Sequence, residues 1–330
     1  MMTNEEICQS IANIIYSYRD GEFGAYDYDH VERWASQFDS TERALVLEET
    51  NKILKRNYIC KGSFEEFVDI IVNSNQVYTG DKELYWRNVS ALNIQINGNS
   101  QHELNVILNN KFFGLYGVQN LIGKTSTEYI YLDDFIFSGN RLYQDMELWL
   151  RNSAPYICRV CILTIGWYSS GQWSTQKKLE ALVNQLGKNI KFVFNSYQDF
   201  RLENRLYRRN FSEIFWPTSS VQVLPEVANF IVTENFNPIY RDVNGIKNQV
   251  FSSLRREEYE KIMLKYGLKI MSFPSQNSPV VKPLGYSTFR GFGFGSTMFS
   301  FRNCPNNNPL AFWWGIHQCR VIIHLVNGIL

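Results

Sequence analysis

The stretch YIYLDDFIFSGNRL, residues 129–142, decides the fold that this sequence predicts. Its first four residues are apolar or aromatic, which predicts a short buried strand at Tyr129–Leu132. Two adjacent carboxylates, Asp133 and Asp134, end that strand, and a short turn then leads into a helix at Arg141–Leu150. Strand, turn and helix in this order begin a β-α-β unit and therefore predict an α/β protein.

The alternation continues on both sides of this stretch. Upstream, a strand at Val89–Ile96 precedes a helix at Gln101–Phe113. Downstream, the pattern predicts a strand at Tyr156–Tyr168, a helix at Thr175–Leu186 and a strand at Ile190–Phe194. Apolar strands that alternate with helices predict a mostly parallel sheet with helices on both faces. Such sheets bind ligands beyond the carboxyl ends of their strands, so we expect a site in the loops that follow the strands.

Three segments of the chain differ in their pattern. Residues 1–78 carry helical periodicity, for example in Ile7 and Ile11, and predict a helical N-terminal subdomain. Residues 79–200 hold the alternating strands and helices of the α/β core. Residues 201–330 show no clear alternation and are interpreted as a C-terminal extension that completes the sheet or covers the cleft.

The composition excludes several classes of protein. The chain has 330 residues, of which 45% are hydrophobic, so it can bury a large core and is neither disordered nor collagen-like. A formal net charge of +1 supplies no overall field that would attract nucleic acid or an acidic membrane. No run of about 18 apolar residues occurs, and six cysteines are too few for a disulfide scaffold. We therefore expect a soluble, cytoplasmic protein that does not bind a membrane.

The carboxylates and the turn of the central stretch suit a sugar phosphate. Carboxylates accept hydrogen bonds from vicinal hydroxyls such as those of a ribose, and each such bond contributes about 1.5–3 kcal/mol. Gly139 allows the main chain to approach a ligand closely, and the free amides at the start of the next helix favour a phosphate. The simpler interpretation is that Asp133 and Asp134 only cap a helix. The buried strand before them and the Ser-Gly turn after them favour a binding site instead.

This pattern resembles the phosphoribosyl pyrophosphate (PRPP) motif of type I phosphoribosyltransferases, with a match from Ile130 to Leu142. The resemblance implies that Asp133 and Asp134 hold the ribose 2′- and 3′-hydroxyls. It also implies that four residues of the turn wrap the 5′-phosphate: Ser138, Gly139, Asn140 and Arg141.

Two positions depart from the motif. Arg141 replaces the usual second hydroxyl residue; its guanidinium can pair with a phosphate by charge but cannot copy a hydroxyl contact. Phe137 stands where purine-salvage members carry an acidic general base. The second departure argues against ordinary purine salvage.

A second local match lies upstream of the motif. In type I phosphoribosyltransferases the turn after the first core strand binds pyrophosphate, and residues 94–101, IQINGNSQ, occupy that place. Backbone amides in a turn of small residues can hold an anion. The candidate pyrophosphate-binding residues are Asn97, Gly98, Asn99 and Ser100.

These motifs, together with residues 30–39, Pro305–Leu310 and the tryptophans at 313 and 314, resemble the PRTase-CE family. That family comprises phosphoribosyltransferase-like proteins of bacterial conflict and anti-phage systems, some of them retron-like. The resemblance implies a protein that binds PRPP with Mg²⁺, or a related nucleotide-like small molecule. It further implies transfer of the phosphoribosyl group to an unknown acceptor by the effector of a defence system, with other proteins of that system as partners.

Two alternatives to an enzyme stay open. The first is a sensor or scaffold that keeps the nucleotide pocket without catalysis, as PRPP-sensing regulators do. The second is a nucleic-acid-binding adaptor that uses the helical N-terminus and four arginines around an expected helix: Arg201, Arg205, Arg208 and Arg209. A metal site at Cys158 and Cys161 is disfavoured, because residues three apart on a strand point to opposite faces.

Overall fold

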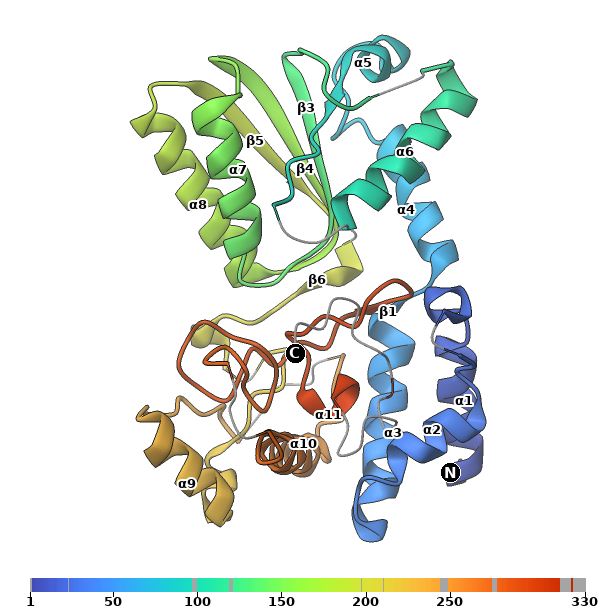
Figure 1. Ribbon diagram of the computed structural model, residues 1–330, viewed down its shortest axis with the longest axis vertical. Helices are drawn as coiled ribbons and strands as arrows, with labels where there is room; N and C mark the ends of the chain where they lie inside the picture. Colours follow the sequence, from blue (N-terminus) through green and yellow to red (C-terminus); the bar gives the residue numbers. More distant parts are fainter. Residues whose placement is uncertain are drawn as a thin grey trace. The chain divides into compact units, whose positions relative to one another are not determined.

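A computed structural model of the chain describes residues 2–22, 24–96, 100–118, 121–196, 198–209, 211–243, 249–274, 278–314 and Ile322. The chain forms two compact units, which Figure 1 colours along the sequence. The sheet unit comprises Gly62–Leu202, and the helical unit comprises Met1–Lys61 together with Glu203–Leu330. The sequence pattern favours domain limits near residues 78 and 200, and these limits stay predictions.

The sheet unit is built around a parallel sheet in the order β2-β3-β4-β5. A short strand, β6, pairs with the end of β4. Both faces of β3 and β4 are buried, which explains why these strands are near-continuous apolar runs. The strands are β2 (Ser90–Ala91), β3 (Glu128–Ile136), β4 (Ile157–Tyr168), β5 (Asn189–Asn195) and β6 (Arg201–Leu202).

The direction of winding reverses at β2. From β2 the chain runs through α6 (Ser100–Tyr116) to Ile122, whose backbone forms a parallel bridge with Ala91 of β2. Ala91 also pairs with Ile130 of β3, so β2 lies between Ile122 and β3. From β3 the chain then proceeds through β4 to β5 on the side away from Ile122. The carboxyl ends of β2 and β3 therefore form a topological switch point.

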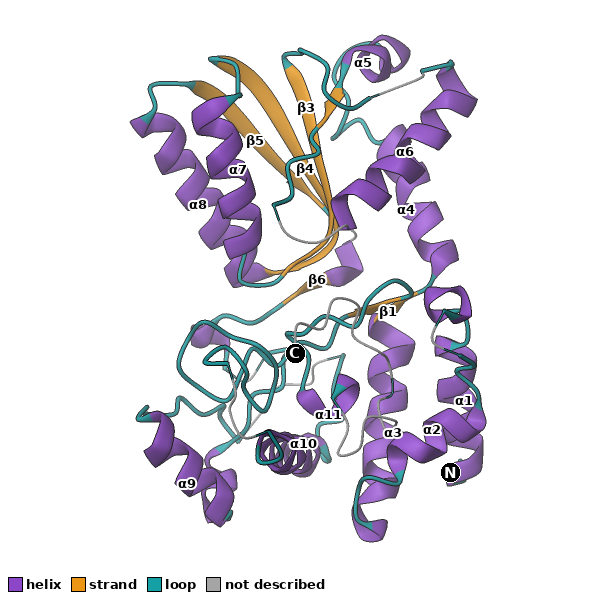
Figure 2. Ribbon diagram, in the orientation of Figure 1, coloured by secondary structure: helices purple, strands orange, loops and turns teal. Residues whose placement is uncertain are grey.

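Helices cover both faces of this sheet (Figure 2). Two of them, α7 and α8, lie side by side on one face, where Tyr131, Met146 and Leu179 share one core. Across the sheet lies α6, on which α5 packs through the stacked rings of Trp86 and Phe112. This architecture confirms the predicted fold class. The helices of the sheet unit are α4 (Lys61–Asn73), α5 (Lys82–Asn88), α6, α7 (Asn140–Asn152) and α8 (Ser169–Gln185), with a 3-10 turn, η2, at Gln198–Phe200.

Two strands of the sheet unit, β2 and β3, differ from their predicted limits by more than one residue at an end. The predicted end of β3 at Leu132 is wrong, because β3 continues to Ile136 and both aspartates lie inside it. The predicted strand Val89–Ile96 shortens to β2, because side chains engage its later amides. Gln101 Oε1 accepts hydrogen bonds from the N–H groups of Ile94 at 2.6 Å and Gln95 at 2.9 Å. These amides are then not available for a strand ladder.

The helical unit has an aromatic core to which both ends of the chain contribute. Trp34 packs against Phe38 and Phe312, and its Nε1 donates a hydrogen bond to the carbonyl of Ala311 at 2.8 Å. β1 (Tyr58–Ile59) pairs in parallel with β7 (Phe299–Ser300). The helices of this unit are α1 (Asn4–Ile15), α2 (Tyr28–Ala35), α3 (Ser40–Asn57), α9 (Pro225–Glu234), α10 (Arg256–Met271) and α11 (Leu310–Trp313), with 3-10 turns at η1 (Tyr18–Gly21), η3 (Leu206–Arg208) and η4 (Ser219–Val223).

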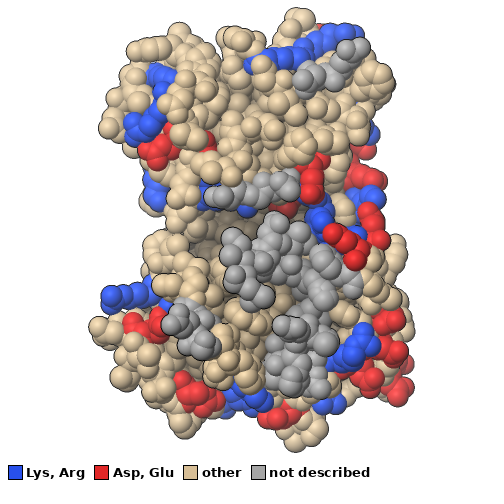
Figure 3. Space-filling model, in the orientation of Figure 1, with Lys and Arg blue, Asp and Glu red and all other residues tan. Residues whose placement is uncertain are grey.

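The prediction of a helix around the four arginines is wrong. Arg201 lies in β6, and Leu206–Arg208 form one 3-10 turn. The reason is local: the carboxylate of Glu203 accepts hydrogen bonds at 2.8 Å from both the N–H and the guanidinium of Arg205, which competes with helix formation. Among the described residues on the face drawn in Figure 3, basic and acidic side chains are interspersed.

None of the described helices has the length and apolar character that a membrane span requires.

Candidate functional site

The carboxyl ends of β2 and β3 bring two loops to the switch point. The loop after β2 is described over Leu92–Ile96 and leads to α6, which begins at Ser100, and the turn after β3 runs from Phe137 to Gly139. Because β2 and β3 are parallel neighbours, both loops leave the sheet at the same edge. Sheets wound in this way bind their ligands at that edge.

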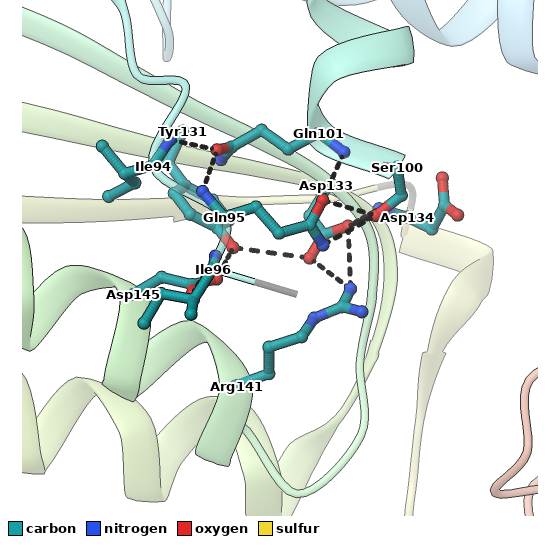
Figure 4. Close-up of polar contacts among 10 residues, drawn as sticks. All are labelled: Ile94, Gln95, Ile96, Ser100, Gln101, Tyr131, Asp133, Asp134, Arg141 and Asp145. Carbon is teal, nitrogen blue, oxygen red and sulfur yellow. Dashed lines mark hydrogen bonds and ion pairs between the residues drawn. The ribbon is translucent and has the colours of Figure 1, made fainter. Parts of the chain in front are cut away.

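Asp133 is the centre of the polar contacts at this edge (Figure 4). The residue is 3% exposed, and its carboxylate accepts a hydrogen bond from Ser100 Oγ at 2.9 Å. Arg141 Nη2 donates to both carboxylate oxygens, at 2.9 Å and 3.2 Å, and the N–H of Asp134 donates at 2.9 Å. Ser100 begins α6 and Arg141 lies in the first turn of α7. One side chain of β3 therefore joins the starts of two helices.

Asp134 lies on the opposite face of β3 from Asp133. Neighbouring residues of a strand point to opposite sides, and Figure 4 shows the Asp134 carboxylate directed away from Arg141. Asp134 is buried, with 6% exposure. Both predicted carboxylates are thus present at this edge, on different sides of the strand.

The Ser-Gly turn packs directly against the start of α8. Gly139 has φ +76°, and a Cβ at this position would lie 1.7 Å from Thr175 Oγ1 and 2.8 Å from the carbonyl oxygen of Gly171. A Cβ on Gly171 would in turn lie 1.7 Å from the carbonyl oxygen of Phe137. Both positions therefore require glycine. Gly139 is also the N-cap of α7 and has no side chain to cap the helix, although Ser138 Oγ accepts a long hydrogen bond, 3.4 Å, from the N–H of Asn140.

The loop after β2 is held by side chains at its described ends. Gln101 accepts hydrogen bonds from two of its amides, and Gln95 Oε1 accepts one from the N–H of Gln101 at 3.0 Å. The N–H of Ile96 donates to Asp145 Oδ1 at 3.0 Å. Of the four predicted pyrophosphate-binding residues, Ser100 contacts Asp133, whereas Asn97, Gly98 and Asn99 lie outside the described residues.

Two further buried groups belong to the same network. Tyr131 donates a hydrogen bond from its hydroxyl to Asp145 Oδ2 at 3.2 Å and lies 3.5 Å from Asp133 Oδ2. Burial raises the pKa of the Tyr131 hydroxyl well above its usual value, so the group stays protonated and acts as a donor. Burial also raises the pKa of Asp145, while its hydrogen bonds with Ile96 and Tyr131 oppose that shift.

A sequence model of the PRTase-CE family matches residues 31–318, nearly the whole chain. The chain belongs to the PRTase-CE family. The name of the PRTase-CE family indicates proteins that resemble phosphoribosyltransferases, and the predicted family is thereby confirmed. Neither the curated proteins nor the solved structures contain a match to this chain.

Sequence reasoning missed two side chains of this PRTase-CE site, Tyr131 and Asp145, and included Gln101 only as the last residue of the matched segment 94–101. Tyr131 and Asp145 carry a signal that spacing reveals. Tyr131 precedes Asp133 by two residues and so shares its face of β3, and Asp145 follows Arg141 by one helical turn. The contacts of Gln101 with Ile94 and Gln95 depend on how the loop folds back and have no comparable signal.

The cysteines of β4 do not offer a reactive pair in this PRTase-CE chain. Cys158 and Cys161 are buried, and burial raises the pKa of each thiol to about 11. Thiols with such pKa values stay protonated at neutral pH. Over the part of the chain that the structure describes, no group of three or more His, Cys, Asp or Glu side chains is placed to hold a metal ion.

Proposed function

We propose that this protein binds PRPP, or a closely related ribose phosphate, at the edge formed by β2 and β3. The observation that carries the proposal is the meeting of three features at one switch point: the Asp133 carboxylate, the glycine-capped start of α7 and the loop after β2. PRPP presents vicinal hydroxyls, a 5′-phosphate and a pyrophosphate. Each of the three features suits one of these groups.

The start of α7 is the proposed site of the 5′-phosphate. The N–H groups of its first turn, which the N-cap Gly139 cannot cap with a side chain, and the positive end of the helix dipole favour an anion. Ser138 and Asn140 flank Gly139 in the turn, and Arg141 adds a guanidinium whose side chain is 49% exposed. Their contacts with the phosphate are proposals that follow from the resemblance and from this geometry.

Asp133 and Asp134 are the proposed acceptors for the ribose hydroxyls. Arg141 pairs with Asp133, so ligand binding requires the guanidinium to exchange this carboxylate for the 5′-phosphate. The Arg141 side chain is the partner that can move, because it is half exposed whereas the Asp133 side chain is 4% exposed. The exchange couples recognition of the phosphate to recognition of the sugar.

Mg²⁺ is the ion that the resemblance implies. Proteins bind Mg²⁺ through one or two carboxylates together with substrate phosphates. Asp133 provides carboxylate oxygens on the side of β3 that faces Ser100 and Arg141, whereas Asp134 points to the other side, so Asp133 together with the phosphates of the ligand is the donor set that fits an ion arriving with the ligand. Bound there, Mg²⁺ supplies positive charge that stabilises the pyrophosphate as it leaves. We propose Asn97, Gly98, Asn99 and Ser100 as the residues that contact the pyrophosphate.

The proposed reaction is phosphoribosyl transfer. An acceptor nucleophile forms a bond to C1′ of the ribose while the bond from C1′ to the pyrophosphate oxygen breaks, and most of the rate gain comes from positioning and charge. Phe137 carries no titratable group, so this position cannot take a proton from the acceptor. An acceptor that needs no base at this position fits best. We further propose that the reaction serves a bacterial anti-phage system, whose other proteins are then partners.

Two features also suit a second function, a sensor or scaffold that binds PRPP without turnover. The Asp133–Arg141 pair places a cation where a sugar is expected, and Phe137 replaces an expected base. A sensor needs an occupied pocket but no proton transfer.

Isothermal titration calorimetry of the full chain with PRPP, ribose 5-phosphate and AMP, each with and without Mg²⁺, tests the proposed function. We expect PRPP to bind with Mg²⁺, and the absence of binding by all three ligands would overturn the proposal. Release of pyrophosphate on addition of cell extract or nucleic acid then separates an enzyme from a sensor. Nucleic-acid binding that weakens steeply with salt and needs neither aspartate would support an adaptor instead.

A further inference from the structure

Thr164 of β4 carries a buried hydroxyl that no other described residue engages. The residue is 0% exposed, and its Oγ1 has no hydrogen-bond partner in the described part of the chain. A buried hydroxyl without a partner costs free energy, whereas a valine of similar shape at the same position would not. A threonine inside this apolar strand therefore needs a physical reason.

Thr164 lies beside Asp133 on the same face of the sheet. The two residues are Cα partners in the parallel ladder of β3 and β4, so their side chains leave neighbouring strands, about 4.8 Å apart, on the same side. The pair two residues earlier, Tyr131 and Ile162, belongs to the core that the sheet shares with α7 and α8. The Thr164 side chain is therefore next to the Asp133 carboxylate, on the side from which Arg141 of α7 approaches.

The hydrogen-bond donors of Asp133 are unevenly divided between its two oxygens. Oδ1 accepts from Ser100 Oγ and from a main-chain N–H, each at 2.9 Å. Oδ2 accepts from Arg141 at 2.9 Å, and its other neighbour, the Tyr131 hydroxyl at 3.5 Å, lies closer to Asp145, at 3.2 Å. In the proposed exchange the guanidinium moves to the 5′-phosphate. Oδ2 then loses its one close donor among the described residues.

We infer that Thr164 is a positioning residue that donates its hydroxyl hydrogen to Asp133 when Arg141 leaves the carboxylate for the phosphate of a ligand. This inference rests on the proposed function, which supplies the exchange. A carboxylate oxygen accepts two hydrogen bonds, so Oδ2 holds Thr164 and still accepts a hydroxyl of the sugar. The unpaired hydroxyl raises the free energy of the ligand-free protein and its pairing lowers that of the complex, so Thr164 favours the ligand-bound arrangement.

A double-mutant cycle of thermal unfolding tests the donor without any ligand. In the native background, Thr164→Val removes an unpaired hydroxyl and should raise the midpoint by about 2 °C. In the Arg141→Met background the hydroxyl already serves Asp133, so Thr164→Val should lower the midpoint by about 2 °C. Thr50→Val is the control, because the buried Thr50 hydroxyl is paired with Tyr259 at 2.7 Å, and it should lower the midpoint in both backgrounds.

Calorimetry with ribose 5-phosphate tests the same contact in the complex. Thr164→Val should weaken binding about tenfold, since the complex loses one charge-assisted hydrogen bond. Thr164→Ser keeps the hydroxyl and should bind within about threefold of the native protein. A purely structural role for Thr164 would not lower the affinity while raising the midpoint.

A change of sign between the two Arg141 backgrounds supports the inference. Effects of the same sign in both backgrounds, or native affinity for ribose 5-phosphate in Thr164→Val, would overturn it. If Thr164→Val does not fold, as judged by circular dichroism, Thr164→Ala replaces it and must cost more in the Arg141→Met background, because the cost of the cavity cancels between the two backgrounds. Native protein that binds neither PRPP nor ribose 5-phosphate refutes the proposed function, while the thermal cycle still decides whether Thr164 donates to Asp133.

Discussion

Arg141 Nη2 lies 2.9 Å from Asp133 Oδ2, so the one basic residue of the turn is paired with the first acid of the same motif. Asp133 in turn raises the pKa of the Arg141 guanidinium, because the neighbouring carboxylate stabilises the positive charge. Arg141 is also the position at which this chain departs from the usual hydroxyl residue of the motif. The departure therefore creates an ion pair within the proposed site.

Replacing Arg141 by threonine should lower the free energy of unfolding by about 1 kcal/mol. Asp133 then keeps Ser100 and a backbone N–H as donors, and the half-exposed arginine limits the loss. Urea denaturation measures the change. Arg151→Thr is the control, because Arg151 pairs with Glu147 on the exposed side of the same helix and should cost no more than about 0.5 kcal/mol. Equal costs for the two variants would contradict a special role for the Arg141 pair.

Gly139→Ala should destabilise the protein by about 2–4 kcal/mol and abolish PRPP binding. The substitution adds strain at φ +76° to a clash with Thr175 and the carbonyl of Gly171. Gly187→Ala is a matched control, since Gly187 has φ +65° but no atom within 4 Å of an added Cβ. We expect the control to cost about 1–2 kcal/mol, from strain alone, and to bind PRPP normally. Thermal unfolding and calorimetry check both parts, and a Gly139→Ala protein that binds PRPP like the control would show that the turn does not contact the ligand.

Asp145→Asn should gain stability relative to the native protein as the pH rises from about 4 to 7. Burial raises the folded-state pKa of Asp145, and an acid with a raised pKa stabilises the fold below its ordinary value near 4 and loses that contribution as the pH rises through the folded-state value. The asparagine variant carries no such charge. Urea denaturation at several pH values measures the difference, with Glu147→Gln on the same helix as the control. A difference between Asp145→Asn and native protein that stays constant with pH would mean that burial does not penalise the charged form.

The core of the sheet unit was predictable because its strands are long and apolar. β3 and β4 are buried runs between helices, so local pattern and tertiary packing agree, whereas β5 is mostly half-buried. The strand at 89–96 was over-predicted because Gln101 and Asp145, from two different helices, engage its amides. Periodicity in one stretch carries no information on such distant side chains.

The candidate site was predictable where one short stretch holds it. Asp133 and the Ser-Gly turn lie within a few residues of each other, so their strand and turn patterns could be recognised together. The contact of Ser100 with Asp133 requires α6 to begin next to β3, and this placement depends on the reversal of winding at β2. The reversal is defined by a single β-bridge between Ile122 and Ala91. One bridged residue is too short a segment to give a strand pattern in the sequence, so this contact could not be predicted.

The most direct test of the account is calorimetric binding of PRPP with Mg²⁺ to Asp133→Asn/Asp134→Asn protein. Two lost charged acceptors should weaken binding about 100-fold or more and abolish any PRPP-dependent turnover, while circular dichroism shows an intact fold. Glu65→Gln/Glu66→Gln makes the same change in charge at two adjacent exposed acids on α4 and should bind like the native protein. Native-like affinity in the aspartate variant would contradict a ribose-phosphate site at the ends of β2 and β3.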